Sequence, residues 1–161
     1  MSYVVQKVSG FPKEKVIGSG TLLDTARLRY IIGEKIGVSS KNIHAYIMGE
    51  HGDSSFVPWT HCYVGGKKLI DIYEETGRDL SELNKIHEEV VNAAYEIINK
   101  KRATYYGIGV ALNRLISAIL DNENAILPVS TLQNGEYGQE GIFIGVPAII
   151  NGEGIKEILK L

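Results

Sequence analysis

His51 lies between two glycines in the stretch MGEHGDS, which spans residues 48–54. A histidine in such a loop, after a predicted strand over 43–47, is presented to solvent and is free to act. Upstream, Asp24 and Arg27 are three residues apart near the start of a predicted helix, so they project from one face. A carboxylate beside the imidazole raises its pKa, and the protonated ring can donate to a carbonyl oxygen. An arginine can bind a carboxylate through two parallel hydrogen bonds. These groups suit the binding of a 2-oxo acid. Converting its carbonyl group to an alcohol would also need a reductant.

Arg29 follows Arg27 by two residues and therefore projects from the other side of the same helix, roughly 200° around its axis. One helix thus offers an aspartate–arginine pair to one surface and a lone arginine to another. Taken alone, the pair is more typical of an ordinary surface ion pair. Only the histidine loop gives it a chemical use.

The elements that must position these groups are predicted from apolar periodicity and from breakers. Gly10 and Pro12 end a first helix that starts near Tyr3. Thr21 can cap the second helix, which runs to about Ile36. Its expected apolar side consists of Leu22, Ala26, Tyr30 and Gly33. A long helix is predicted over 80–102, and a further helix reaches about 120, with Gly107 or Gly109 expected to bend or break the chain between them.

The strands are predicted over shorter stretches. Besides 43–47, a hairpin is expected from 55–64 and 68–71, joined through Gly65-Gly66. Two more strands, 125–133 and 141–150, are separated by the turn-rich NGEYGQEG. The last residues, 154–161, are predicted to begin a final helix. Helices interleave with antiparallel hairpins, so the predicted class is α+β (mixed α/β), with residues 1–161 as a single domain.

The composition excludes several classes of function. The chain has 161 residues, 44% of them apolar, and a net charge of -2. It therefore has no basic surface for nucleic acid or an anionic membrane. No apolar run approaches the roughly 20 residues that span a bilayer, and no signal peptide is visible. Cys62 is the only cysteine, so it forms no internal disulfide and no CxxC metal site. We expect no metal and a cytoplasmic location.

Three stretches carry a resemblance to a known family. GSGTLLDTARLRY (18–30), GEHGDS (49–54) and the opening YVVQKVSGFPKEKVIGSGT resemble the C-terminal half of bacterial NAD-dependent L-lactate dehydrogenases, within the lactate/malate dehydrogenase family. The likeness runs from Tyr3 to Leu161 without a large gap. GEHGDS is more similar to lactate dehydrogenases than to the GGHGD of related malate dehydrogenases. The resemblance implies long helices packed on antiparallel sheets.

The resemblance also implies roles for individual residues. His51 would be the acid/base, Asp24 its orienting partner and Arg27 the clamp on the substrate carboxylate. Thr104, in ATYYGIG, would line the substrate pocket, and Ser19, in GSGT, would lie beside the nicotinamide of NAD. The substrates implied are pyruvate and L-lactate.

Arg29 and His44 match a second motif of the family. In many bacterial members, an arginine two residues after the clamp and a histidine seven before the catalytic one bind fructose 1,6-bisphosphate, and both spacings hold here. The resemblance therefore implies an allosteric effector and a homo-oligomer, a dimer or a tetramer, whose two-fold interface brings two such pairs together. An ordinary surface arginine and strand histidine remain the alternative.

The dinucleotide-binding half of the family has no counterpart in this sequence. GSG at 18–20 and GIG at 107–109 lack the third glycine and the preceding long strand of a Rossmann fingerprint. We therefore expect the Rossmann domain, which binds most of NAD, to be missing, and the chain alone to have little or no activity. The alternatives are another 2-hydroxy-acid dehydrogenase, such as one acting on malate, and a non-catalytic oligomerisation module.

Overall fold

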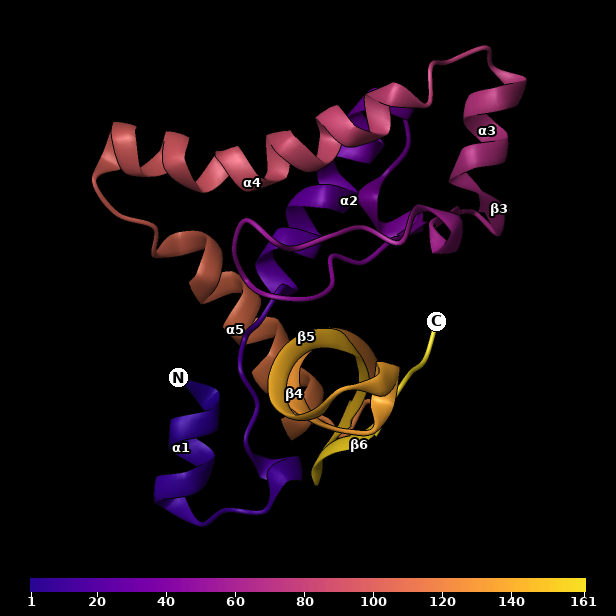
Figure 1. Cartoon of the computed structure of the whole chain (residues 1–161). Coiled ribbons are helices and arrows are strands. Elements are labelled where there is room, and N and C mark those ends of the chain that lie inside the picture. Colours follow the sequence, from indigo (N-terminus) through magenta and orange to yellow (C-terminus); the bar gives the residue numbers. More distant parts are fainter.

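The computed structural model describes residues 1–161, which form five α-helices and two three-stranded antiparallel sheets (Figure 1). The helices are α1 (Ser2–Ser9), α2 (Leu22–Ile36), α3 (Leu69–Glu75), α4 (Ser81–Lys101) and α5 (Tyr106–Leu120). The first sheet contains β1 (Ile43–His44), β2 (Tyr63–Val64) and β3 (Lys67–Lys68), and the second contains β4 (Ala125–Asn134), β5 (Glu140–Asn151) and β6 (Gly154–Ile158). The predicted α+β class is confirmed.

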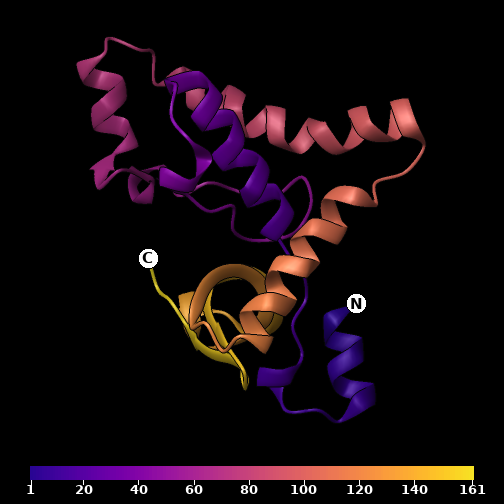
Figure 2. The ribbon, with the colours of Figure 1, turned by 180° about the vertical axis from the view of Figure 1, so that it is seen from behind.

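The apolar side chains form two separate hydrophobic clusters. The first joins α2, α3 and α4 with the chain around β1, and Tyr73, Leu28 and Ile86 are completely buried in it. The second joins α5 with the sheet β4–β5–β6. Figures 1 and 2, which view the ribbon from opposite sides, show α5 covering one face of this sheet. The two clusters fix the positions of the helices and loops that carry the predicted site residues.

Helix α2 contributes to both clusters. Leu22, in its first turn, packs with α5 and the second sheet, whereas Leu28 and Ile32 pack in the first cluster. Residues between these positions therefore lie where the two clusters meet, and Asp24 is one of them. Gly37, at φ 76°, ends the helix in the left-handed conformation and donates its N–H to the Gly33 carbonyl.

The apolar side predicted for α2 was wrong in part. Leu22 and Gly33 are buried as predicted, whereas Ala26 is exposed and Tyr30 is 60% exposed. The other buried residues of the helix are Thr25, Leu28 and Ile32. The start of α2 packs in the second cluster and the rest of it packs in the first. The buried positions therefore do not follow a single line of residues spaced four apart. Thr21 lies at the N-cap position, as predicted, but its side chain makes no capping hydrogen bond.

Helices α4 and α5 follow the prediction more closely. Leu83, Ile86 and Val90 are buried along α4. The break between the two helices falls at Arg102, which adopts a left-handed φ of 62°. Gly107 and Gly109, one of which was expected to bend or break the chain, both lie inside α5. A Cβ on Gly107 would be 3.3 Å from Leu23 Cδ1, so this glycine allows α5 to approach α2 closely.

Three predicted elements differ in the structure. β1 covers only residues 43–44 of the predicted strand 43–47. The predicted hairpin 55–64/68–71 reduces to β2 and β3, because the chain enters α3 directly at Leu69. Residues 154–161 begin with strand β6, which pairs with β5 through Ile150 and Ile155, so the predicted final helix was wrong. The two-residue turn between the strands is Gly152-Glu153, and Asn151 before it accepts a 2.9 Å hydrogen bond from the N–H of Glu153. These turn residues favour a hairpin over the short helical pattern. None of the five helices combines the length and apolar character that crossing a membrane requires.

Candidate active site

The loop that carries His51 is fixed at both ends by backbone hydrogen bonds. Met48 and Phe56 exchange two bonds of 2.9 and 3.0 Å, which closes the base of the loop. Gly49 and Gly145 exchange two more, of 2.8 and 2.7 Å, which attaches the loop to β5 of the second sheet. A Cβ on Gly145 would lie 3.1 Å from the Gly49 carbonyl oxygen, so this close approach favours glycine. The loop therefore has a defined position although its tip is exposed.

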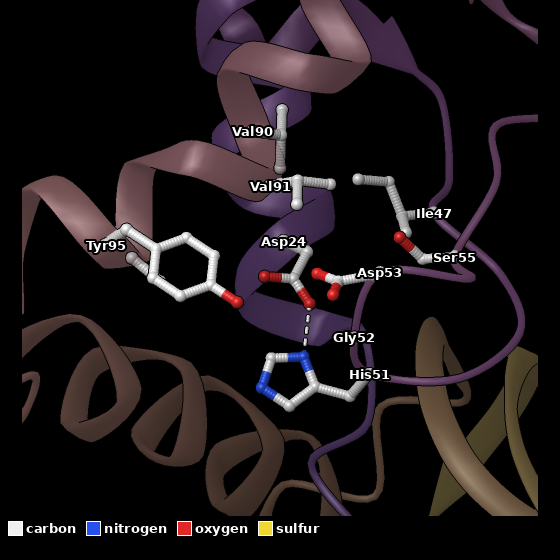
Figure 3. Close-up of a pocket in the computed structure, with 10 residues that line it drawn as sticks. Asp24, Ile47, His51, Gly52, Asp53, Ser55, Val90, Val91 and Tyr95 are labelled. Carbon is white, nitrogen blue, oxygen red and sulfur yellow. Dashed lines mark hydrogen bonds and ion pairs between the residues drawn. The ribbon is translucent and has the colours of Figure 1, made fainter.

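Asp24 and His51, 27 residues apart in the sequence, meet at a short hydrogen bond. Nδ1 of His51 lies 2.6 Å from Oδ2 of Asp24 (Figure 3). Only 14% of the Asp24 side chain is exposed, against 62% of that of His51. A mostly buried carboxylate thus holds one ring nitrogen, while the other nitrogen faces away from it and has no protein partner.

The charge of this pair favours the protonated imidazole. The hydrogen bond that His51 donates to Asp24 is the largest influence, and it raises the pKa of His51 above its ordinary value. Partial burial and the positive charge of Arg27 oppose this rise, and the charge of Glu50 adds to it. The imidazole therefore keeps its proton to a higher pH than a free histidine does.

Arg27 lies on the same side of α2 as Asp24, one turn further along. Its Nη1 is 3.5 Å from Oδ1 of Asp24, and only 16% of its side chain is exposed. The carboxylate thus touches both cations, through one oxygen each. The guanidinium makes no other ion pair or hydrogen bond, so most of its N–H groups remain free for an anion.

A hollow of about 270 Å³ brings four of the predicted site residues together. Ser19, Arg27, His51 and Thr104 all line it. They come from four places in the chain: the segment before α2, α2 itself, the His51 loop, and the link between α4 and α5. The rest of its wall is mainly apolar and consists of Gly20, Leu23, Ala94 and Ile108. A small polar molecule with an apolar part fits such a wall.

A second hollow, of about 150 Å³, lies beside the Asp24–His51 pair (Figure 3). Tyr95 of α4 points its hydroxyl toward Asp24 from one side, and Asp53 lies on the other. Ser55, at the end of the loop, is 3.2 Å (Oγ to Nε2) from His87 of α4. His87 follows the buried Leu83 by four residues and precedes the buried Val90 by three, and this spacing places it on the inward side of α4.

Arg29 and His44 lie outside both hollows. Nε of Arg29 donates a 3.0 Å hydrogen bond to the carbonyl of Ala45, and its guanidinium lies 5.0 Å from the centre of the Tyr46 ring. Burial lowers the pKa of Arg29, and no carboxylate pairs with it. His44 is exposed on β1, and the hydrogen bond and the aromatic contact of Arg29 go to Ala45 and Tyr46 instead of to His44. The arginine is thus a partly buried cation whose backbone contact was not foreseen from the sequence.

Known proteins match this chain over nearly its whole length. The sequence model of the lactate/malate dehydrogenase alpha/beta C-terminal domain matches residues 21–161. L-lactate dehydrogenase of Pediococcus pentosaceus is 53% identical over 160 residues, which are 99% of this chain and 50% of that protein. L-lactate dehydrogenase of Streptococcus sanguinis is 56% identical over 157 residues, which are 96% of this chain and 48% of that protein.

The solved structures extend this similarity to three dimensions. The minor L-lactate dehydrogenase of Enterococcus mundtii, in its ligands-bound form, gives a TM-score of 0.96 at 48% identity, over 99% of this chain and 51% of that one. MGS-M5, a lactate dehydrogenase from a Medee basin deep-sea metagenome, gives 0.96 at 51% identity, over 99% and 52%. The chain spans about half the length of the relatives it matches.

Proposed function

This chain belongs to the lactate/malate dehydrogenase family, and we propose that it forms the substrate-binding and catalytic half of an L-lactate dehydrogenase. The complete reaction converts pyruvate, NADH and a proton to L-lactate and NAD⁺. One observation carries the proposal. Asp24 holds Nδ1 of His51 at 2.6 Å, and both His51 and Arg27 open onto one hollow.

His51 acts as the general acid in pyruvate reduction and as the base in the reverse direction. Because Asp24 occupies Nδ1, the other ring nitrogen is left to donate its proton to the carbonyl oxygen of the substrate. The raised pKa of His51 keeps that proton available near neutral pH. Asp24 also stabilises the positive ring and fixes its orientation.

Arg27 binds the substrate carboxylate, and Thr104 lines the wall against which the rest of the substrate packs. The free part of the Arg27 guanidinium can form two parallel hydrogen bonds with a carboxylate. Both residues share the hollow with His51, and its volume of about 270 Å³ suits a small 2-oxo acid beside one ring of a cofactor. This arrangement brings the substrate carbonyl within reach of the imidazole.

The residues around the hollow fit the nicotinamide end of NAD and no more of it. Ser19 offers a hydroxyl at one edge, and Leu23 and Ile108 offer apolar surface for a ring. No glycine-rich phosphate loop follows a strand in this chain. The chain spans about half the length of its relatives, which supports the proposal that another part of the complete enzyme binds the remainder of NAD. When bound, NADH supplies a hydride to the carbonyl carbon.

Arg29 and His44 form the proposed site for fructose 1,6-bisphosphate. A partly buried guanidinium without a carboxylate partner supports this assignment, because a phosphate would supply the missing negative charge. Arg29→Gln is expected to abolish activation by the sugar bisphosphate while the unactivated rate stays within about threefold. An Arg29→Gln enzyme with normal activation would disprove the assignment.

We also propose a homo-oligomer in the cytoplasm. Val110, Ile116 and Leu120 of α5 are 71%, 52% and 78% exposed, which supports an interface on this helix. Cys62 is the single cysteine and is completely buried, in keeping with a reducing compartment. Light scattering with and without fructose 1,6-bisphosphate measures the assembly, and a monomer under both conditions would contradict the oligomer.

The central test compares substrates in the longer protein that joins this chain to its dinucleotide-binding half. Pyruvate should be reduced faster than oxaloacetate, and His51→Asn should lower kcat at least about 10²-fold. Preference for oxaloacetate would favour a malate dehydrogenase instead. Full turnover by His51→Asn would favour a non-catalytic assembly role for this half. Residues 1–161 alone are expected to reduce little or no pyruvate. Sustained reduction by this chain alone would contradict the proposal that most of NAD is bound by another part of the complete enzyme.

A further inference from the structure

The segment that leads into the His51 loop is bound to α2 by side chains instead of by a neighbouring strand. Thr21 Oγ1 donates to the carbonyl of Ile47 at 2.6 Å, and the N–H of Ile47 donates to Thr25 Oγ1 at 2.9 Å. Arg29 Nε donates to the carbonyl of Ala45 at 3.0 Å. These three residues of the helix region are spaced four apart, so they form one row. The row replaces the strand partner that residues 45–47 lack, which explains why β1 ends at residue 44.

The contacts to Ile47 are buried and leave no alternative partners. Thr21 and Ile47 are completely buried, and Thr25 is 2% exposed. A buried backbone group without a hydrogen bond is strongly unfavourable, and here both backbone groups of one residue depend on two hydroxyls. Thr21 is the N-cap residue of α2, but its hydroxyl donates to the Ile47 carbonyl and makes no capping hydrogen bond. The start of the loop is therefore fixed relative to α2.

The same helix carries the partner of the imidazole. Asp24 lies between the two threonines in sequence, and His51 follows Ile47 by four residues. A shift of Ile47 along α2 would therefore move the imidazole relative to its carboxylate, to which it is joined by a 2.6 Å bond. We propose that Thr21 and Thr25 are positioning residues, whose hydroxyls hold the loop of His51 over its carboxylate partner. The consequence for turnover rests on the proposed role of His51 as the acid.

The decisive variant is Thr25→Val, which keeps the shape of the side chain and removes the acceptor for the Ile47 N–H. In the longer protein, kcat for pyruvate reduction should fall about tenfold, because a displaced catalytic group lowers the rate of the chemical step. KM should change less than about threefold, since Arg27 keeps its place on α2. Thr25→Ser, which restores the hydroxyl, should recover most of the rate.

The titration of the imidazole gives a second measurement that a purely structural role would not change. Measured by NMR in residues 1–161, the pKa of His51 should move toward its ordinary value in Thr25→Val, because the bond to Asp24 loosens. Thr21→Val should act in the same direction. Thr131→Val is the control, because Thr131 is 3% exposed on β4 but its hydroxyl makes no hydrogen bond. It should leave both kcat and the titration unchanged.

The outcomes separate this inference from the function on which it rests. If Thr25→Val and Thr21→Val keep the wild-type kcat and the wild-type titration of His51, the threonines only stabilise the fold and the inference is overturned, whatever the loss in melting temperature. If the wild-type protein does not reduce pyruvate, the proposed function fails, while the NMR titration still decides whether the threonines position His51. Should Thr25→Val not fold, Thr21→Val gives the same two measurements.

Discussion

Replacing Asp24 by asparagine tests the link between geometry and chemistry most directly. The amide keeps the size of the carboxylate and removes its charge. It therefore weakens the 2.6 Å contact with His51 Nδ1 and the 3.5 Å ion pair with Arg27. Without the carboxylate, the pKa of His51 should fall toward its ordinary value, since the hydrogen bond that the ring donates to Asp24 is the largest cause of its rise. The pH dependence of turnover and of the free energy of unfolding should therefore differ between Asp24→Asn and the wild type.

The effect on stability has a sign that can be derived. A histidine whose pKa is raised in the folded state stabilises the fold fully below its unfolded pKa of about 6.5. This contribution is lost as the pH rises through the raised pKa. A hydrogen bond to a charged group contributes about 1.5–3 kcal/mol. Because 62% of the His51 side chain is exposed, solvent screening reduces this to about 1 kcal/mol. The difference in unfolding free energy between wild type and Asp24→Asn should therefore shrink by about 1 kcal/mol from low to high pH.

The assay has two parts. Urea unfolding of residues 1–161 across about pH 5 to 9 measures the stability difference. In the longer protein, the loss of NADH absorbance measures pyruvate reduction. There kcat/KM near neutral pH should fall about 10²-fold or more. In a plot of kcat/KM against pH, the fall in rate on the alkaline side should begin at a lower pH than in the wild type. Glu50→Gln is the matched control, because Glu50 influences His51 only through its charge and is the smallest cause of the raised pKa.

The reasoning would be refuted by either of two results. One is an Asp24→Asn enzyme with wild-type kcat/KM and an unchanged fall in rate on the alkaline side. The other is a Glu50→Gln variant that lowers the pKa of His51 as much as Asp24→Asn does. Such a result would mean that the negative charges around the loop raise the pKa of His51, and not its hydrogen bond with Asp24.

Three further predictions follow from other contacts. Arg27→Lys should raise KM for pyruvate at least about tenfold with a smaller change in kcat, because an ammonium cannot form two parallel bonds with a carboxylate; equal KM values in steady-state kinetics would contradict it. Gly145→Ala should lower the unfolding free energy by about 1–3 kcal/mol, since its Cβ would lie 2.7 Å from Thr21 Oγ1 and 3.1 Å from the Gly49 carbonyl oxygen; an unchanged thermal midpoint would exclude this clash. Burial raises the pKa of Cys62 to about 12, so alkylation of the folded chain at mildly alkaline pH, followed by mass spectrometry, should be far slower than that of the unfolded chain.

Much of the site could be predicted because its signals are local in the sequence. The three-residue spacing of Asp24 and Arg27 places both on one face of a helix, and the structure has them 3.5 Å apart. The glycines around His51 predict an exposed loop, and its side chain is 62% exposed. The bounds of α2 and α4 were likewise predicted within a residue or two at each end.

The errors occurred where tertiary contacts override a local pattern. Residues 154–161 have a short helical pattern, but β5 offers them an open edge, and pairing at that edge satisfies more backbone groups. Residues 45–47 alternate like a strand, yet side chains of α2 take the place of the partner strand. A local pattern states what a segment can form, and the available partners decide between the possibilities.

The sequence by itself determined which chemical groups are present, which helix carries them and which family the chain resembles, because residue types and short spacings need no knowledge of distant contacts. Only the tertiary structure decided that Asp24 meets His51 across 27 positions of the chain, and that Thr21 and Thr25 hold the loop in place. It also decided that Gly145, on a strand almost a hundred residues later, supports the same loop. These contacts join segments that no periodicity connects, and they lie around α2, the helix that contributes to both hydrophobic clusters.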